Sequence, residues 1–435
     1  MFFFSKKFSS GRSEDSLPGM SSKPKPQYTD SFLELEGPPD PLVTISGKHY
    51  HYFGGNAFLG LQSNPFVLEA ACEAVLRYGT GAGTNRFCLT ATPILEVERM
   101  ISDILSTERT FYYNSDLLGP QIILDTLRGT FDRVIVDEAI DHYILETVKL
   151  RCQKDPLLVF NNNDPEHLTQ MLKKNLKKSQ RPLLLTSGVF SASGTIAPLT
   201  DYARSLSEYN DASMVIDDSF GFGILGENGF GTCEYFDLPL EKINRTKQDE
   251  LLQMDEMDVF EDIPPQNQAE QGLKQSFPIH FYTSSSLSNA LGGTGGFISG
   301  TTRFIDQIAE RSGDLQELSP PTSPLAAATS KCLEITFRDG TIRKQLISNT
   351  LYFRKKLQEL GLPIDMTPVP IISLSLGTNS NMRHLRKQLS EEGILVTYLP
   401  ASPGNTPDGA LRISIFASHT EEMLDHFIDR FRKWI

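Results

Sequence analysis

Residues 284–297 read SSSLSNALGGTGGF, and residues 215–231 read VIDDSFGFGILGENGFG. The first stretch continues an apolar segment at 279–282 with serines and then glycines. A strand that leads into such a turn commonly brings backbone close to a phosphate or to another chain. The second stretch begins as a short buried strand and delivers Asp217 and Asp218 to a glycine-rich strand end. Ligands of open α/β sheets bind at this end of the strands.

Around these stretches the chain alternates between apolar strands and amphipathic helices. We expect strands at 110–114, 133–137, 156–160, 181–190 and 214–218, and helices at 117–127, 142–151, 165–176 and 199–206. Alternation of this kind, with continuous apolar strands, indicates a mostly parallel sheet covered by helices on both faces. The sequence therefore predicts a large doubly wound α/β domain.

The whole chain is expected to divide into three parts. Residues 1–40 mix phenylalanine with Lys, Ser and Gly and predict a disordered tail, with a weak membrane-surface contact or a targeting remnant as the alternatives. An N-terminal segment and the large domain would fill 41–347. Within them, 238–275 predicts an acidic flexible loop, with a regulatory docking segment as the alternative. Residues 348–435 predict a smaller α+β domain.

Composition excludes several classes of function. The formal net charge is −13, from 54 acids against 41 bases, which argues against a nucleic-acid-binding surface. The 5 cysteines are scattered without a C-x-x-C pair, so they fit a reducing compartment and predict no metal site. No run of about 18 apolar residues occurs, so no transmembrane helix is expected.

The two opening stretches, in their order along the chain, resemble the α-oxoamine synthases. These pyridoxal-phosphate enzymes condense an amino acid with an acyl-CoA, and the resemblance implies their fold type I. In that family an acid after the first strand pairs with the pyridine nitrogen, and Asp217 stands in its place. A lysine in the later run forms a Schiff base with the cofactor, and Asn289 stands there instead. Because an amide cannot form an imine, the defining chemical group is absent.

Other family positions also depart from the pattern. The histidine that stacks on the cofactor ring matches Asp141, with His142 one place further on. The second family histidine matches Phe220. The phosphate-holding segment falls on residues 114–116, where Asp116 would put a negative charge beside a dianion. The resemblance therefore implies no catalytic residue, no bound cofactor and no metal in this chain.

Three more residues receive a role from the resemblance. Thr322 and Ser323 begin a helix after a proline-rich segment, and would reach across a dimer to the partner's phosphate, with helix capping as the alternative. Arg412 matches the arginine that receives the substrate carboxylate, a task that suits a planar guanidinium. In this chain Arg412 would be a relic or a structural ion pair. Arg86, in the run YGTGAGTNR, would lie in a segment packed against the dimer partner.

This pattern of losses is similar to that of the non-catalytic first long-chain-base subunits of eukaryotic serine palmitoyltransferase. The similarity implies a heterodimer with a lysine-bearing catalytic homologue. That partner would hold pyridoxal 5'-phosphate and condense serine with palmitoyl-CoA to 3-ketosphinganine, in sphingolipid biosynthesis, at the cytosolic face of the endoplasmic reticulum membrane. Two departures from those subunits are expected: this chain would lack their membrane-anchoring N-terminal helix, and 238–275 would be an insertion or an expanded loop.

Two alternatives stay open. The chain could be a self-sufficient α-oxoamine synthase that uses another lysine, such as Lys274 or Lys331. It could also be a non-enzymatic scaffold or regulatory protein with a different partner.

Overall fold

The computed structural model describes residues 33–86, 88–152, 157–239, 243–246, 278–312, 319–402 and 408–435. The described residues from 35 to 435 form one compact unit. The predicted tail therefore lies almost wholly outside the described residues, and so does most of the predicted loop at 238–275.

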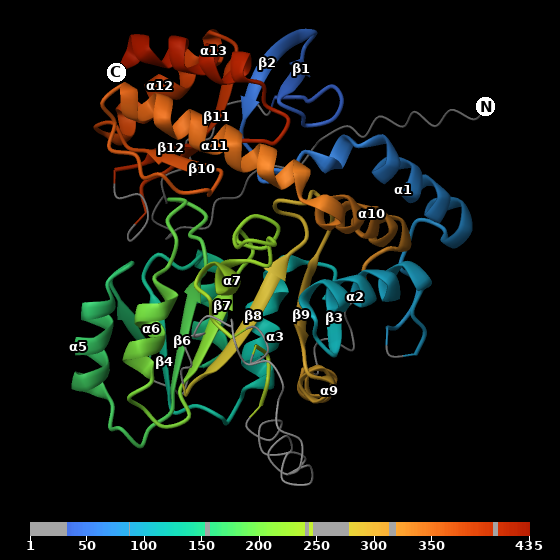
Figure 1. Cartoon of the computed structure of the whole chain (residues 1–435), viewed down its shortest axis with the longest axis vertical. Helices are drawn as coiled ribbons and strands as arrows, with labels where there is room; N and C mark the ends of the chain where they lie inside the picture. Colours follow the sequence, from blue (N-terminus) through green and yellow to red (C-terminus); the bar gives the residue numbers. More distant parts are fainter. Residues whose placement is uncertain are drawn as a thin grey trace, which may run out of the picture. The chain divides into compact units, whose positions relative to one another are not determined.

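The larger of two sheets forms the framework of the site (Figure 1). In the described part of the chain it has 7 strands in the order β3-β9-β8-β7-β6-β4-β5. Their bounds are β3 Arg109–Tyr113, β4 Arg133–Asp137, β5 Leu157–Phe160, β6 Pro182–Ser187, β7 Ser213–Asp217, β8 His280–Ser286 and β9 Gly296–Gly300. Strands β4 to β8 are parallel, and β9 is antiparallel to both of its neighbours. The predicted mostly parallel sheet is confirmed.

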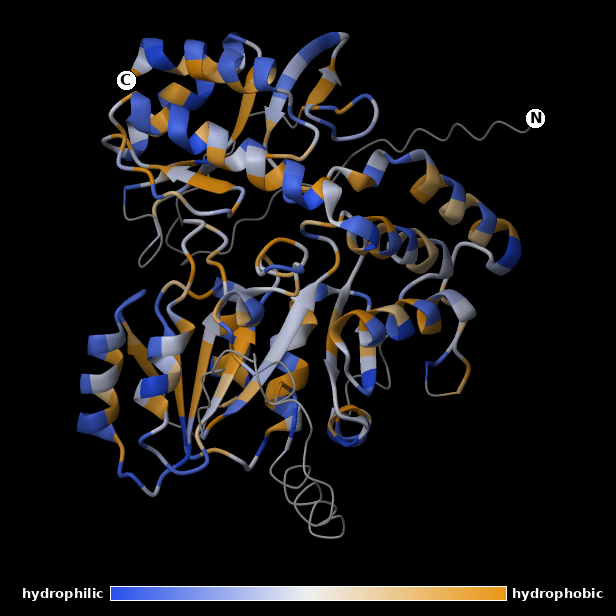
Figure 2. Cartoon of the chain, in the orientation of Figure 1, coloured by the Kyte–Doolittle hydropathy of each residue, from blue (hydrophilic) through white to orange (hydrophobic). Residues whose placement is uncertain are grey.

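Helices cover both faces of this sheet, because successive strand residues point to opposite sides. Val134 and Val136 of β4 pack toward one face, and Ile135 between them packs toward the other. The first face carries α3 (Gly119–Thr126), α4 (His142–Arg151) and α9 (Thr302–Arg311); the second carries α5 (Pro165–Asn175), α6 (Leu199–Leu206) and α7 (Thr232–Tyr235). Figure 2 shows β4, β6 and β7 as hydrophobic strands between helices with hydrophilic outer sides, as expected for a doubly wound fold.

The second sheet joins the two ends of the described chain in the order β1-β2-β11-β12-β10. The strands are β1 Leu42–Ile45, β2 Lys48–Phe53, β10 Ile371–Leu374, β11 Ile394–Leu399 and β12 Ala410–Ser414; α11 (Thr341–Glu359), α12 (Asn379–Glu391) and α13 (Glu421–Phe431) accompany them. The N-terminal segment joins this sheet, because β2 runs parallel to β11, with Phe53 opposite Val396. Pairing between such distant segments leaves no local signal in the sequence.

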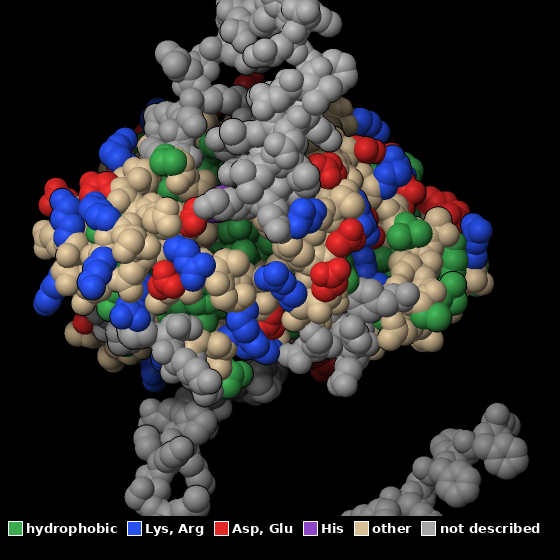
Figure 3. Space-filling view, turned by 90° about the horizontal axis from the view of Figure 1, so that it is seen from below, with side chains coloured by type: hydrophobic (Ala, Val, Ile, Leu, Met, Phe, Trp, Pro, Cys, Tyr) green, Lys and Arg blue, Asp and Glu red, His purple; other side chains and the backbone are tan. Residues whose placement is uncertain are grey.

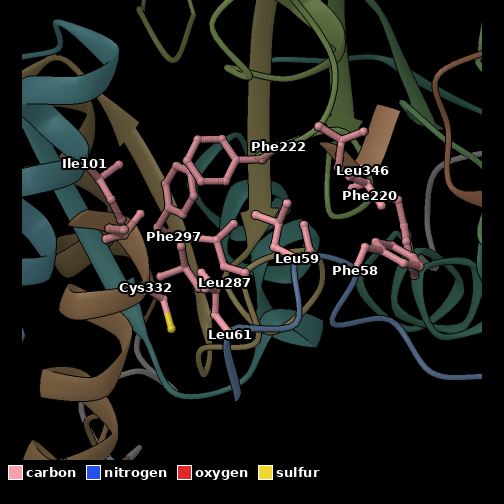
Figure 4. Packing of buried hydrophobic residues seen from close by; sticks show 14 of the residues in the cluster. Phe58, Leu59, Leu61, Ile101, Phe220, Phe222, Leu287, Phe297, Cys332 and Leu346 are labelled. Atoms are coloured by element: carbon pink, nitrogen blue, oxygen red, sulfur yellow. The ribbon is translucent and has the colours of Figure 1, made fainter. Parts of the chain in front are cut away.

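A third packed region holds the glycine-rich loops in place. It includes α1 (Pro65–Tyr78), α2 (Thr92–Leu105) and α10 (Ser323–Asp339). Short 3-10 turns occur in the chain at Leu61–Ser63, Asp116–Leu118 (η2) and Arg432–Trp434. In Figure 4 the rings of Phe222 and Phe297 pack together, and their centroids are 4.8 Å apart in an edge-on arrangement. Phe58 and Leu287 belong to the same buried cluster. The loops after β7 and β8 are thus fixed by a common core.

One part of the predicted flexible loop is well anchored. Ile243 forms a bridge with Phe281 of β8. Asn244 is fully buried, and its Nδ2 donates to the carbonyls of Thr283 at 3.1 Å and Ser299 at 2.6 Å. Its Oδ1 accepts from the Thr283 amide at 3.0 Å. This correction to the prediction concerns residues 243–246, which acidic composition alone could not separate from their surroundings.

Among the described residues, no helix combines the length and the apolar character that crossing a bilayer requires.

Candidate functional site

The site is centred on Asp217, the last residue of β7. This residue is only 4% exposed. The Tyr143 hydroxyl donates to Oδ2 at 2.8 Å, and the Ser219 hydroxyl and backbone amide donate to Oδ1. Burial raises the pKa of Asp217 to about 6; the charge of Asp141 adds to this rise, while the donors from Ser219 and Tyr143 oppose it. Both oxygens of the predicted pyridine-pairing acid are therefore already hydrogen-bonded within the chain.

Asp218 has a structural role instead. Its carboxylate accepts hydrogen bonds from the Thr232 amide, at 2.9 Å, and from the Thr232 hydroxyl. The adjoining loop approaches so closely that a Cβ at Gly221 or Gly231 would meet an Asp218 oxygen at 2.0 or 1.9 Å. Burial raises the pKa of Asp218 to about 7. This acid ties the glycine-rich loop to the end of β7.

Asn289, at the predicted lysine position, is hydrogen-bonded to the residue that follows this carboxylate pair. It is 8% exposed, and its Nδ2 donates to the Ser219 carbonyl at 3.2 Å. Its backbone amide donates to the Ser286 hydroxyl at 3.1 Å. The neighbouring Ala290 has a φ of 50°, an unusual conformation for a residue with a side chain. The amide is thus part of a tight turn that its own hydrogen bonds stabilise.

Asp116 lies at the segment predicted to correspond to a phosphate site. It begins η2, and Ser286 donates its hydroxyl proton to Oδ2 of Asp116 at 2.7 Å. The same Ser286 oxygen accepts from the Asn289 amide. Asp116, Ser286, Asn289, Ser219 and Asp217 consequently form one continuous hydrogen-bonded chain. A carboxylate at this position disfavours a phosphate dianion.

Asp141, not His142, points into the site. Asp141 precedes α4 and accepts a hydrogen bond from the Ser191 hydroxyl. Burial raises the pKa of Asp141, and Ser191 and the positive charge of Arg412 oppose this rise. His142 is the first residue of α4 and is exposed. The alternative in which His142 replaces the ring-stacking histidine is therefore not supported.

Arg412 reaches the site from the second sheet, on β12. It is 8% exposed, and its Nη2 donates to Asn56 Oδ1 at 2.7 Å. The guanidinium carbon lies 5.7 Å from the centre of the Phe220 ring. Burial lowers the pKa of Arg412 to about 10, an effect that Asp141 and Tyr52 oppose. The structure thus brings together three predicted positions, Arg412, Phe220 and Asp141.

The other predicted residues have contacts of their own. Thr322 occupies the N-cap position of α10 without a side-chain capping hydrogen bond, and Ser323 is 5% exposed. Their contact with a partner's phosphate stays a prediction. Arg86 forms an ion pair with Glu98 and lies over the ring of Phe111, with its Cζ 4.2 Å from the ring centre.

Tyr143, Ser219, Ser191 and Asn56 are site residues that sequence reasoning missed. Tyr143 follows Asp141 by two positions, and Ser219 directly follows the acid pair, so proximity to predicted positions was the available signal. Ser191 and Asn56 offered none, because their roles depend on contacts between distant segments.

Pyridoxal phosphate, the cofactor of the fold family, does not fit the residues present. The group expected to bind it covalently is an amide engaged with Ser219, and the phosphate position carries the carboxylate of Asp116. A further carboxylate, Asp141, stands where an aromatic ring would stack. No step of catalysis through that cofactor follows from this site.

Comparison with known proteins decides the family. The pattern of the aminotransferase class I and II family matches residues 53–431. The chain belongs to this family. Within it, the chain is 26% identical over 403 residues to a serine palmitoyltransferase of Sphingobacterium spiritivorum, covering 92% of this chain and 90% of that protein. It is 28% identical over 404 residues to the 8-amino-7-oxononanoate synthase of Alkaliphilus oremlandii, covering 92% and 91%. Both relatives are α-oxoamine synthases, so the predicted resemblance to that group is confirmed.

Solved structures of the family agree on the fold. A serine palmitoyltransferase from S. paucimobilis, with a bound PLP–myriocin aldimine, superposes with a TM-score of 0.75 at 22% identity, covering 93% of this chain and 92% of that one. An 8-amino-7-oxononanoate synthase from Francisella tularensis gives a TM-score of 0.67 at 18% identity, covering 88% and 97%. The fold is therefore that of the pyridoxal-phosphate enzymes of fold type I.

Proposed function

We propose that this chain is a lysine-less subunit of a serine palmitoyltransferase. It would pair with a homologous catalytic subunit that carries the lysine and pyridoxal 5'-phosphate, and that condenses serine with palmitoyl-CoA to 3-ketosphinganine in sphingolipid biosynthesis. The observation that carries the proposal is Asn289: an amide stands at the lysine position, buried and hydrogen-bonded to the Ser219 carbonyl. The complex would associate with the cytosolic face of the endoplasmic reticulum membrane through its other subunits.

An exposed apolar stripe on α1 supports a partner subunit. Leu68, Val75 and Leu76 are 50%, 39% and 89% exposed. Their spacing of seven and eight residues puts them on one side of the helix. Clustered exposed leucines on a folded protein commonly mark an interface with another protein. The buried residues of α1 are Val67 and Ala74, and α1 packs on α10, so the exposed stripe is available to the catalytic homologue.

Another face of the molecule carries mixed charges instead of an apolar stripe. On the face drawn in Figure 3, Lys and Arg side chains are interspersed with Asp and Glu side chains. Such a mixed surface is typical of solvent exposure and forms no basic field for a nucleic acid.

The alternative of a self-sufficient synthase needs another lysine at the site. Of the two candidate lysines, the structure describes only Lys331, and its contacts do not support this role. Lys331 lies on α10 and forms an ion pair with Glu334 one turn later. In the described part of the chain, its hydrogen bond and ion pair are with Glu334 and not with Asp217. The other candidate, Lys274, lies outside the described residues.

Purification with and without a partner tests the proposal. The chain alone, mixed with pyridoxal phosphate, is expected to show no absorption band of a lysine-bound cofactor. Together with a lysine-bearing homologue it is expected to copurify and to raise the condensation of serine with palmitoyl-CoA above that of the homologue alone. A band and activity from the single chain would establish the self-sufficient synthase. Copurification with other proteins and without any gain of activity would establish the scaffold.

A further inference from the structure

A pocket of about 600 Å³ opens outside the site around Asp217. Its lining residues come from the loop after β7, from α7 and the residues that follow it, from α11 and from the segment before β10. Asp217, Asn289 and Arg412 are not among them. Pockets of this size commonly hold small molecules. The proposed function assigns no role to this one.

The buried residues that line the pocket are apolar. Ile224 and Leu238 are 0% and 3% exposed, and Ile347 and Pro368 beside them in the lining are half-buried. These side chains come from three parts of the chain that meet only after folding. Such a wall favours a ligand with an apolar body, because their contact removes apolar area of both from water.

Exposed residues of the same pocket carry negative charge. Glu227 and Asp237 line it, and neither side chain forms a hydrogen bond or an ion pair with another described residue. Glu234 adds a third carboxylate, and no lysine or arginine is among the described residues that line the pocket. The one guanidinium close by, that of Arg343, donates to the carbonyls of Gly226 and Glu227. Three carboxylates therefore outnumber one positive charge.

Hydrogen bonds hold the acidic loop of the pocket in one conformation. Glu234 accepts from the Asn228 amide at 3.1 Å through Oε1, and from the Phe230 amide at 2.9 Å through Oε2. Arg343 donates from Nη1 to the Gly226 carbonyl at 2.8 Å. The turn that carries the exposed carboxylate is therefore fixed at both ends. A preformed pocket loses little conformational entropy when a ligand binds.

We propose that this pocket binds an alkylammonium ion, that is, a primary amine on an alkyl chain. The chain packs against Ile224, Leu238 and Ile347. The ammonium group, which has three donors and no acceptor, donates to the carboxylates of Glu227 and Asp237.

The charge of the pocket selects against acidic molecules with the same apolar body. A fatty acid or an acyl-CoA would bring negative charge beside three carboxylates, which is unfavourable. A neutral alcohol would use the apolar wall but would leave the carboxylates without a counter-charge. An alkylammonium ion matches both features of the lining.

Only the identity of the natural amine rests on the proposed function. The condensation product, 3-ketosphinganine, carries a primary amine on a long alkyl chain and so belongs to this class of ligand. The pocket would then let the non-catalytic subunit respond to the product of its own complex.

Calorimetric titration of the full chain at neutral pH tests the inference, with octylamine as the probe. Alkylamines are protonated under these conditions. We expect octylamine to bind at least about tenfold more tightly than octanoate, which reverses the charge, and than ethylamine, which lacks the long chain. Octanol should bind about fivefold more weakly than octylamine, because partly exposed ion pairs contribute modestly. Octylamine that binds no more tightly than octanoate, or not at all at millimolar concentration, would overturn the inference.

Variants locate the binding. Glu227→Gln and Asp237→Asn remove one charge each, and Asn tolerates the φ of 51° at position 237. Each should weaken octylamine binding about threefold and leave octanol binding unaltered, a difference that a merely structural role would not produce. Glu359→Gln removes an exposed carboxylate at the end of α11 and is the matched control. Unaltered octylamine binding in the double variant would refute the assignment.

The outcome is separable from that of the proposed function. If the chain copurifies with a lysine-bearing homologue and raises its activity but does not bind octylamine, only this inference fails. If the chain binds octylamine but shows the absorption band of a lysine-bound cofactor, only the proposed function fails.

Discussion

At the scale of single residues, the lysine position shows how a lost group becomes part of the structure. Asn289 donates to the Ser219 carbonyl, and Ser219 in turn donates to Asp217. These hydrogen bonds continue through Ser286 to Asp116. Restoring one group therefore disturbs bonds that stabilise its neighbours.

Asn289→Lys alone is expected to leave the chain unable to bind pyridoxal phosphate covalently. The new amine would lie close to Asp217, and nearby carboxylates favour the protonated amine, which is not a nucleophile. Asp141 and Asp116 would also remain. Borohydride reduction followed by peptide mass spectrometry measures the label on residue 289. The combined variant with Asp141→His and Asp116→Asn is the comparison, and a label on the single variant would show that the pocket is more intact than its contacts indicate.

The buried acid Asp218 predicts a pH dependence of stability. Burial raises its pKa to about 7, above the value of about 4 in an unfolded chain. The folded state therefore binds the proton more tightly, and this group's contribution to stability decreases as the pH rises from about 4 to about 7. Thermal midpoints of Asp218→Asn and of the unaltered chain should diverge across this range, with the unaltered chain losing more stability. Parallel curves would argue against a raised pKa.

At the scale of elements, regular segments were predictable and their anchors were not. The helices at His142–Arg151 and Leu199–Leu206 begin and end where the apolar spacing predicts. The order of the two glycine-rich runs was enough to locate Asp217 and Asn289. The hydrogen bonds of Tyr143 and Asn244 depend on side chains that meet only after folding, and such contacts have no periodicity along the sequence.

Asn244→Ala tests the anchor between β8 and β9. The change removes hydrogen bonds to Thr283 and Ser299 and leaves their buried backbone groups unsatisfied, which we expect to lower the free energy of unfolding by about 3 kcal/mol. Urea denaturation measures the loss. Asn210→Ala, at an exposed position, should change stability by less than about 0.5 kcal/mol. A similarly small effect at Asn244 would contradict its anchoring role.

Two deletions in the acidic segment distinguish the anchoring role of Asn244 from the role of the rest of the segment. Removing residues 247–270 is expected to leave the fold and partner binding intact, because a doubling of loop length changes the closure free energy by only ~0.6 kcal/mol. Removing 241–270 also deletes Asn244 and should destabilise the chain. Loss of partner binding in the shorter deletion, measured by copurification, would identify the segment as a docking element.

At the scale of the whole molecule, the exposed leucines of α1 predict that the chain is not a stable monomer. Leu76→Asp is expected to weaken association with the partner at least about tenfold, since a charge at an apolar interface is desolvated without compensation. Because Leu76 is 89% exposed, folding stability should not change. Light scattering measures whether the chain alone is a monomer, and a binding titration measures its association with the partner.

Leu150→Asp is the matched control for this change. Leu150 is 65% exposed on α4, at a distance along the chain from the α1 stripe. The Leu150→Asp substitution should leave association with the partner unaltered. If both substitutions weaken association equally, or if the unaltered chain is a well-behaved monomer, the stripe is not the interface.

The pairing of β2 with β11 sets an order for biosynthesis. Strands β1 and β2 leave the ribosome early, but their partner at Ile394–Leu399 is among the last segments to be translated. At roughly 5–20 residues per second, the delay is on the order of tens of seconds. The larger sheet, by contrast, is complete at Gly300. A nascent chain stalled before residue 394 would therefore carry a folded larger sheet and an unpaired edge on β2, the edge that chaperones would have to shield until translation ends.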